Sequence, residues 1–157
     1  MTTYFTWRQL RFGKHIDKTL PQIILHDPDW FYWAHGNSVF KSPALAEQAS
    51  EIADKASRIK IPKPDPENWR IRYEIHPSGA FQDILIVPLK EVYPDGSDIL
   101  FGESLDLFMP RRFKAYDKLG YRLLLAKVKK YWFNEEALTK DRCERFFIEE
   151  ANFVPHC

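Results

Sequence analysis

The clearest hydrophobic pattern of the chain lies between Pro43 and Ile59. Apolar residues recur there every three or four positions, and mainly glutamate, glutamine, aspartate and lysine fill the opposite side. This period is typical of an α-helix with one buried face. Because Ser42 and Pro43 together form a helix-start signal, the pattern predicts a helix over residues 43–59.

Two shorter helices are predicted before it by their start signals. Thr19 and Gln22 have the spacing of a capping box, in which each side chain binds the backbone N–H of the other residue. This box predicts a helix over about residues 20–25. An aspartate–proline pair at positions 27–28 repeats the signal, and it predicts a second helix that stops at Gly36.

Four stretches have the features of β-strands. Residues 4–12 are rich in large and aromatic side chains, and residues 69–75 alternate between apolar and polar side chains. Residues 81–89 are mostly apolar, and residues 99–108 are apolar with an interruption at Gly102. Alternation indicates one buried face, whereas a continuous apolar run indicates burial on both faces. The turns between the last three stretches predict a small antiparallel sheet.

A helical region follows Pro110 and extends over residues 111–133. On a helical wheel one side is formed by Phe113, Gly120, Leu124 and Tyr131. Five of the eight cations gather on another side within about 80°, where they form one basic stripe if the helix is continuous: Arg111, Lys114, Lys118, Arg122 and Lys129. Gly120 is the position at which a first helix could end. A final helix is predicted from an N-cap at Thr139 to about residue 150, and it would bury its cysteine and its two phenylalanines.

These elements together predict an α+β protein, in which a small N-terminal helical module accompanies an antiparallel three-stranded sheet packed by C-terminal helices. We expect the module over residues 1–60, a proline-rich linker over 61–68 and an α+β region over 69–157. A single continuous domain is the alternative. With 157 residues, of which 45% are hydrophobic, the chain can bury a substantial core.

The net charge of +1 hides an uneven distribution along the chain. Residues 111–134 contain eight Lys or Arg and one Asp or Glu, whereas residues 61–110 contain four and nine. Such a basic segment favours a polyanion, or an acidic protein surface, as its partner. No apolar run approaches the ~20 residues of a membrane helix. We therefore expect no membrane association and a cytoplasmic location.

The densest stretch of the chain reads Phe12-Gly13-Lys14-His15-Ile16-Asp17-Lys18-Thr19-Leu20, followed by Asp27-Pro28-Asp29-Trp30-Phe31-Tyr32-Trp33. It resembles a small module found at the C-terminus of exodeoxyribonuclease X-like proteins and in short bacterial proteins described as quorum-sensing-regulated virulence factors. The resemblance covers about residues 8–35. It implies association with DNA-processing proteins and brings no catalytic residues.

One residue of this stretch departs from the family pattern. Asp17 occupies the position at which that family usually has a second glycine. Aspartate tolerates a positive φ better than most residues do, so we expect the turn to be preserved.

The candidate nucleic-acid contacts come from the turn and from the basic helical region. Lysine can contact phosphates, while exposed aromatic rings can stack on the bases of a single strand. Eight residues are assigned to this role: Lys14, His15, Lys18, Arg111, Lys114, Lys118, Arg122 and Lys129. In the alternative interpretation, the aromatic side chains form the core of the module and the cations are ordinary solvated surface.

The sequence thus favours a non-enzymatic, nucleic-acid-associated protein of bacterial or phage origin, either DNA-binding or accessory to DNA processing. No cofactor and no metal are expected. The first alternative is a protein–protein adaptor or inhibitor that uses the aromatic cluster and the acidic middle segment. The five histidines have neither the spacing nor the cysteine partners of a zinc site.

A small magnesium-dependent nuclease is a weaker alternative. The carboxylates that suggest it lie in the middle of the chain: Asp83, Glu91, Asp95, Asp98, Glu103 and Asp106. Such nucleases hold the metal between carboxylates and use a nearby lysine. The expected Asp/Glu-x-Lys pattern does not follow at the required strand position.

Overall fold

The structure is a computed structural model that describes residues 7–91, 99–114 and 116–156. Its helices and strands follow in chain order: α1 (Leu20–His26), α2 (Pro28–Gly36), α3 (Pro43–Ala56), η1 (Pro66–Asn68), β1 (Trp69–Ile75), β2 (Phe81–Pro88), β3 (Ile99–Gly102), α4 (Arg111–Lys114), α5 (Lys118–Phe133), α6 (Lys140–Ile148) and η2 (Glu150–Asn152). None of these helices combines the length and the apolar character needed to cross a bilayer.

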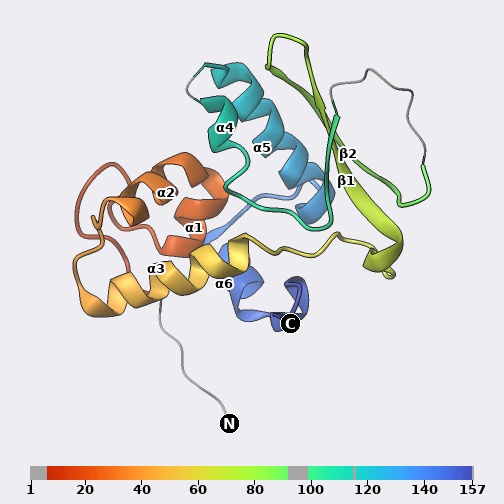
Figure 1. Cartoon of the computed structure of the whole chain (residues 1–157). Helices are drawn as coiled ribbons and strands as arrows, with labels where there is room; N and C mark the ends of the chain where they lie inside the picture. The colour runs from red at the N-terminus through yellow and green to blue at the C-terminus, as the bar shows by residue number, and fades with distance from the viewer. Residues whose placement is uncertain (1–6, 92–98, 115, 157) are drawn as a thin grey trace.

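The sheet has the strand order β2-β1-β3, and both pairs are antiparallel. Helix α5 packs against β2. Figure 1 shows α1, α2 and α3 on one side of the molecule and the β1–β2 hairpin on the other, with α4 and α5 beside the hairpin. The predicted α+β class and the three-stranded antiparallel sheet are therefore confirmed.

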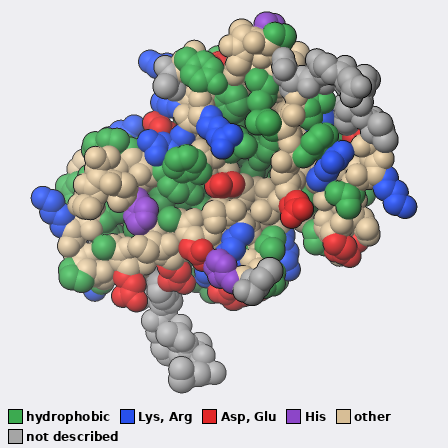
Figure 2. Space-filling view, viewed as in Figure 1, with side chains coloured by type: hydrophobic (Ala, Val, Ile, Leu, Met, Phe, Trp, Pro, Cys, Tyr) green, Lys and Arg blue, Asp and Glu red, His purple; other side chains and the backbone are tan. Residues whose placement is uncertain are grey.

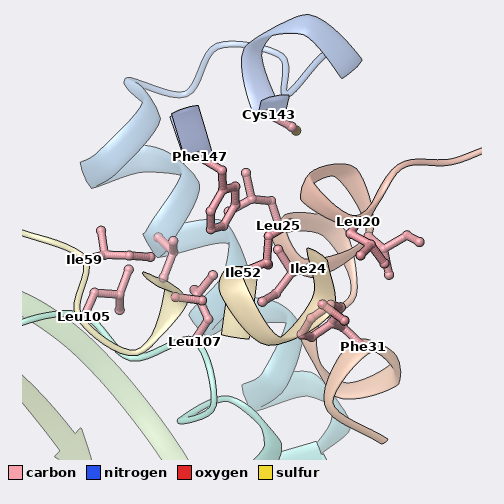
Figure 3. Packing of buried hydrophobic residues seen from close by; sticks show 14 of the residues in the cluster. Leu20, Ile24, Leu25, Phe31, Ile52, Ile59, Leu105, Leu107, Cys143 and Phe147 are labelled. Atoms are coloured by element: carbon pink, nitrogen blue, oxygen red, sulfur yellow. The ribbon is translucent and has the colours of Figure 1, made fainter. Parts of the chain in front are cut away.

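One buried hydrophobic cluster contains side chains from both sides of residues 61–68. Figure 3 shows Phe147 of α6 near Leu25 of α1, with Ile59 beside Leu105. Ile59 forms isolated β-bridges with Leu105 and Phe153, so the segment after α3 contacts two distant parts of the chain. Ile61, inside the proline-rich segment, is buried as well.

The helix starts follow the sequence signals. The Gln22 side chain accepts a hydrogen bond from the Thr19 N–H at 3.1 Å, as the capping box requires. The carboxylate of Asp27 caps α2, and the hydroxyl of Ser42 caps α3. The predicted helix over 28–36 is confirmed, and α1 ends one residue beyond its predicted end.

Three predicted elements are shorter in the structure. The helix predicted over 43–59 ends at Ala56, because the backbone of Ile59 bonds to Leu105 in a β-bridge. The strand predicted over 99–108 ends at Gly102, beyond which Leu105 and Leu107 turn into the core. Within the predicted strand over 4–12, residues 7–12 form only one bridge, and residues 4–6 lie outside the described residues.

The last helix also ends earlier than expected. Helix α6 stops at Ile148, and a short 3₁₀ turn follows. Its predicted buried residues agree with the structure for Cys143 and Phe147, which are fully buried, whereas Phe146 is partly buried.

The helical region predicted over 111–133 is divided into two helices, α4 and α5, so the continuous helix that the sequence left open does not form. The break falls before Gly120 rather than at it. Asp117 is the N-cap of α5, and its carboxylate accepts hydrogen bonds from the Gly120 N–H at 2.7 Å and from the Phe81 N–H of β2 at 2.9 Å. A Cβ atom at Gly120 would overlap this carboxylate. Gly120 therefore makes room for the cap that attaches α5 to the sheet.

We expect Gly120→Ala to destabilise the protein. Alanine favours helix by about 1 kcal/mol over glycine, but displacing Asp117 removes a cap and a hydrogen bond to the sheet, so the net loss is about 1–2 kcal/mol. Chemical denaturation measures this difference. Gly36→Ala is the matched control, because Gly36 ends α2 with open space around it, so alanine should not destabilise the protein there and should stabilise it by at most about 1 kcal/mol. An equal effect of the two substitutions would contradict the role given to Gly120.

Candidate nucleic-acid interface

The turn after Phe12 is held by its own backbone. Gly13 and Asp17 have φ angles of 75° and 68°, both in the left-handed region. The Leu10 N–H donates to the Lys18 carbonyl at 2.9 Å, and the Asp17 N–H donates to the Leu10 carbonyl at 2.8 Å. The expectation that aspartate accommodates a positive φ at this position is therefore confirmed.

The carboxylate of Asp27 is the centre of the contacts around this turn. Its Oδ2 atom lies 3.0 Å from both the Lys14 Nζ and the His15 Nε2 atoms, and its Oδ1 atom accepts a hydrogen bond from the Tyr121 hydroxyl at 3.2 Å. Partial burial alone would raise the pKa of Asp27, but the hydrogen bonds from Lys14 and His15 hold the pKa below its ordinary value of 3.8. Asp27 is thus an ionised partner for two of the predicted contacts.

A second carboxylate brings the basic region of α4 to the same place. The Arg111 Nε atom lies 3.2 Å from the Asp29 Oδ1 atom. The Asp29 N–H donates to the Tyr121 hydroxyl at 3.1 Å, and the Lys114 ammonium lies 4.6 Å from the centre of the Tyr121 ring. The structure therefore brings the turn and α4 together around Tyr121, but Lys14, His15 and Arg111 have carboxylates of this chain as partners.

In the part of the chain that the structure describes, four other predicted cations are not paired with carboxylates and can contact a ligand. Lys18, Lys118 and Arg122 are exposed, and Lys129 is half-buried. Within the described residues, none of these four forms an ion pair with Asp or Glu. Since α4 and α5 are separate helices, the predicted cations do not form one continuous stripe.

A further cationic surface was not identified from the sequence. A hollow of about 1280 Å³ lies beside the connection between α2 and α3 and is lined by Trp7, Arg8, Gln9, Arg11, Phe12, Asn37, Ser38, Val39, Lys41, Ser42, Leu45 and Lys140. Hereafter these residues are called the cationic hollow. Four of them are cations and none is a carboxylate, and the Phe12 side chain is 40% exposed.

The charges of the cationic hollow are mostly uncompensated. Arg8, Arg11 and Lys41 are exposed, and none of them forms an ion pair within the described part of the chain. Lys140 differs, because its Nζ atom lies 3.3 Å from the Glu144 carboxylate. The only sequence signal was the closeness of Arg8 and Arg11 to the turn. The other two cations follow in distant segments, so no local pattern joins all four.

The aromatic side chains are divided between core and surface. Phe31 is fully buried, and Trp30 packs edge-on against His15 and Phe40 with ring centroids 4.8 and 6.0 Å apart. Phe12 and Trp33 are exposed. The interpretation of these residues as core thus holds for Phe31, whereas Trp30 is partly buried against the core. The exposed ring of Phe12 lies beside the cationic hollow.

Metal chemistry gains no support from the described residues, which contain no group of three or more His, Cys, Asp or Glu placed to hold a metal ion. Two carboxylates of the acidic middle segment have cationic partners. The Asp83 Oδ1 atom lies 3.6 Å from the Lys127 Nζ atom, and the Glu91 Oε2 atom lies 3.3 Å from the Arg72 Nη1 atom. Asp95 and Asp98 lie outside the described residues.

No family model, curated protein or solved structure matches this chain. The resemblance of residues 8–35 to the exodeoxyribonuclease X C-terminal-like module therefore stays a prediction. The fold and the surface define an α+β protein with a cationic hollow and with a separate basic face on α5.

The pH dependence of stability tests the role of Asp27. Because its pKa is lower in the folded protein than in the unfolded chain, its contribution is complete above pH 3.8 and is lost as the pH falls through the folded pKa. Asp27→Asn retains an N-capping side chain but removes the charge. We expect it to lower the free energy of unfolding by about 1–3 kcal/mol near neutral pH and by much less at about pH 3.

Denaturation curves at the two pH values measure this difference. Asp141→Asn is the matched control, since its carboxylate pairs with Arg145 on an exposed helix surface and should contribute less than about 1 kcal/mol. A loss for Asp27→Asn that is the same at both pH values would show that ionisation of Asp27 does not contribute.

Proposed function

We propose that this protein binds nucleic acid and that the cationic hollow is the main contact surface. The observation that carries the proposal is the gathering of Arg8, Arg11, Lys41 and Lys140 around a hollow whose lining contains no carboxylate. When the cations of such a cluster neutralise phosphates, the nucleic acid releases its bound counterions, and this release provides most of the affinity for a nucleic acid backbone. The proposal includes a cytoplasmic location.

The ion pairs around Asp27 favour the hollow over the turn as the contact surface. If Lys14, His15 and Arg111 turned toward a phosphate, the carboxylates of Asp27 and Asp29 would lose partners. Breaking such partly buried pairs opposes binding. Arg8, Arg11 and Lys41 carry no comparable cost, because no ion pair within the described residues has to be broken.

The exposed ring of Phe12 favours an unpaired strand as the ligand. Base stacking on an aromatic side chain requires a base that is not already stacked in a duplex. Phe12 lines the hollow together with the cations, so one nucleotide can contact both kinds of group. We therefore propose single-stranded nucleic acid rather than duplex as the preferred ligand.

Fluorescence anisotropy with a labelled single strand of about 20 nucleotides and the corresponding duplex tests this proposal. We expect the single strand to bind more tightly. With about three phosphates neutralised, its affinity should fall roughly 20-fold between about 50 and about 200 mM salt. Failure of both ligands to bind at the lower salt concentration would contradict nucleic-acid binding.

Charge reversal locates the contact surface. The double substitution Arg11→Glu and Lys41→Glu should weaken single-strand binding by at least about tenfold, because it removes two phosphate contacts and adds two repulsive charges. The double substitution Lys118→Glu and Arg122→Glu changes the same number of charges on α5 and should have a smaller effect. A larger loss in the α5 variant would assign the contacts to the predicted basic region instead of the hollow.

A further inference from the structure

The outward face of α5 exposes two leucine side chains at the surface. Leu119 is 68% exposed and Leu123 is 44% exposed, and Ala126 is exposed at the next position of the same face. In Figure 2, hydrophobic side chains reach the surface over α5 and the adjacent hairpin. The spacing of four and then three residues repeats the apolar seam of a helix that pairs with another helix.

The charges beside this seam all have one sign. Helix α5 contains five cations and no carboxylate: Lys118, Arg122, Lys127, Lys129 and Lys130. On the helical wheel one side of the seam is lined by Lys118, Arg122 and Lys129. Lys130 follows Ala126 by one turn and lies in line with the seam itself. Only Lys127 has an ion pair among the described residues, with Asp83. The seam and its basic border are hereafter called the α5 seam.

We propose that the α5 seam binds an amphipathic helix of an acidic protein partner, in which apolar anchors are bordered by glutamate or aspartate. Charge complementarity selects this occupant. A second copy of α5 would bring Arg122 and Lys129 against the same cations, and like charges at these positions oppose pairing. A nucleic acid strand would neutralise the cations but would leave Leu119 and Leu123 without an apolar partner.

The α5 seam is separate from the cationic hollow. None of the residues that line the hollow belongs to α5. The inference therefore stands independently of the proposed nucleic-acid binding. With both surfaces occupied, the protein would connect a nucleic acid to an acidic protein, which is the action of an adaptor.

The test uses the full chain and two synthetic helical peptides of about three heptads. The first carries Leu at the seam positions and Glu at the flanking positions, and the second carries Ala in place of each Leu. Glutamate repulsion keeps either peptide from pairing with itself. We expect the leucine peptide to bind in the micromolar range by isothermal titration calorimetry, and the alanine peptide to bind at least about tenfold more weakly.

Variants of the protein assign the binding to the seam. Leu119→Ala with Leu123→Ala, and separately Arg122→Glu with Lys129→Glu, should each weaken the leucine peptide by at least about tenfold. Ile148→Ala is the matched control, because it removes an exposed aliphatic side chain from α6, and it should bind the peptide as the unaltered protein does. Circular dichroism checks that each variant keeps the same fold.

Four results would overturn the inference. The first is absence of leucine-peptide binding at about 100 µM, and the second is equal binding of the two peptides, which would indicate charge attraction alone. The third is unchanged peptide binding by the double leucine variant. The fourth is loss of oligonucleotide binding in that variant, which would make α5 part of a nucleic-acid site.

Discussion

The ionised carboxylate of Asp27 joins parts of the chain that are far apart in sequence. It caps α2, binds Lys14 and His15 of the turn and accepts a hydrogen bond from Tyr121 of α5. The Tyr121 hydroxyl also accepts a hydrogen bond from the Asp29 N–H, so polar contacts attach α2 to α5 beside the hydrophobic core. Asp27 also pairs with Lys14, whose ammonium would otherwise be available to a polyanion. This carboxylate therefore affects both the packing of the segments and the charges that are left for binding.

Local signals predicted most of the secondary structure because they depend on neighbouring residues. The starts of α1, α2 and α3 follow from Thr19, Asp27 and Ser42, and the alternation over residues 69–75 predicts β1. The break between α4 and α5 could not be predicted in this way. Asp117 caps α5 while it binds the backbone of Phe81, which is 36 residues away in sequence.

The sequence predicted one set of candidate contacts, but it predicted neither their arrangement nor the cationic hollow. The sequence identifies Lys14, His15 and Arg111 as candidate contacts, whereas their pairing with Asp27 and Asp29 depends on the fold. The cationic hollow was missed because its four cations come from three separate segments of the chain. Likewise, the exposure of Leu119 depends on which face of α5 packs against β2, and the helical wheel leaves that choice to tertiary structure.

The central claim is that nucleic acid binds in the cationic hollow, and chemical-shift mapping with a single-stranded oligonucleotide tests it most directly. The account predicts that the amide signals of Arg8, Arg11, Phe12 and Lys41 shift as the oligonucleotide is added, while those of Leu119 and Leu123 stay in place. Shifts that are concentrated on α5, or spread evenly over the surface, would contradict it.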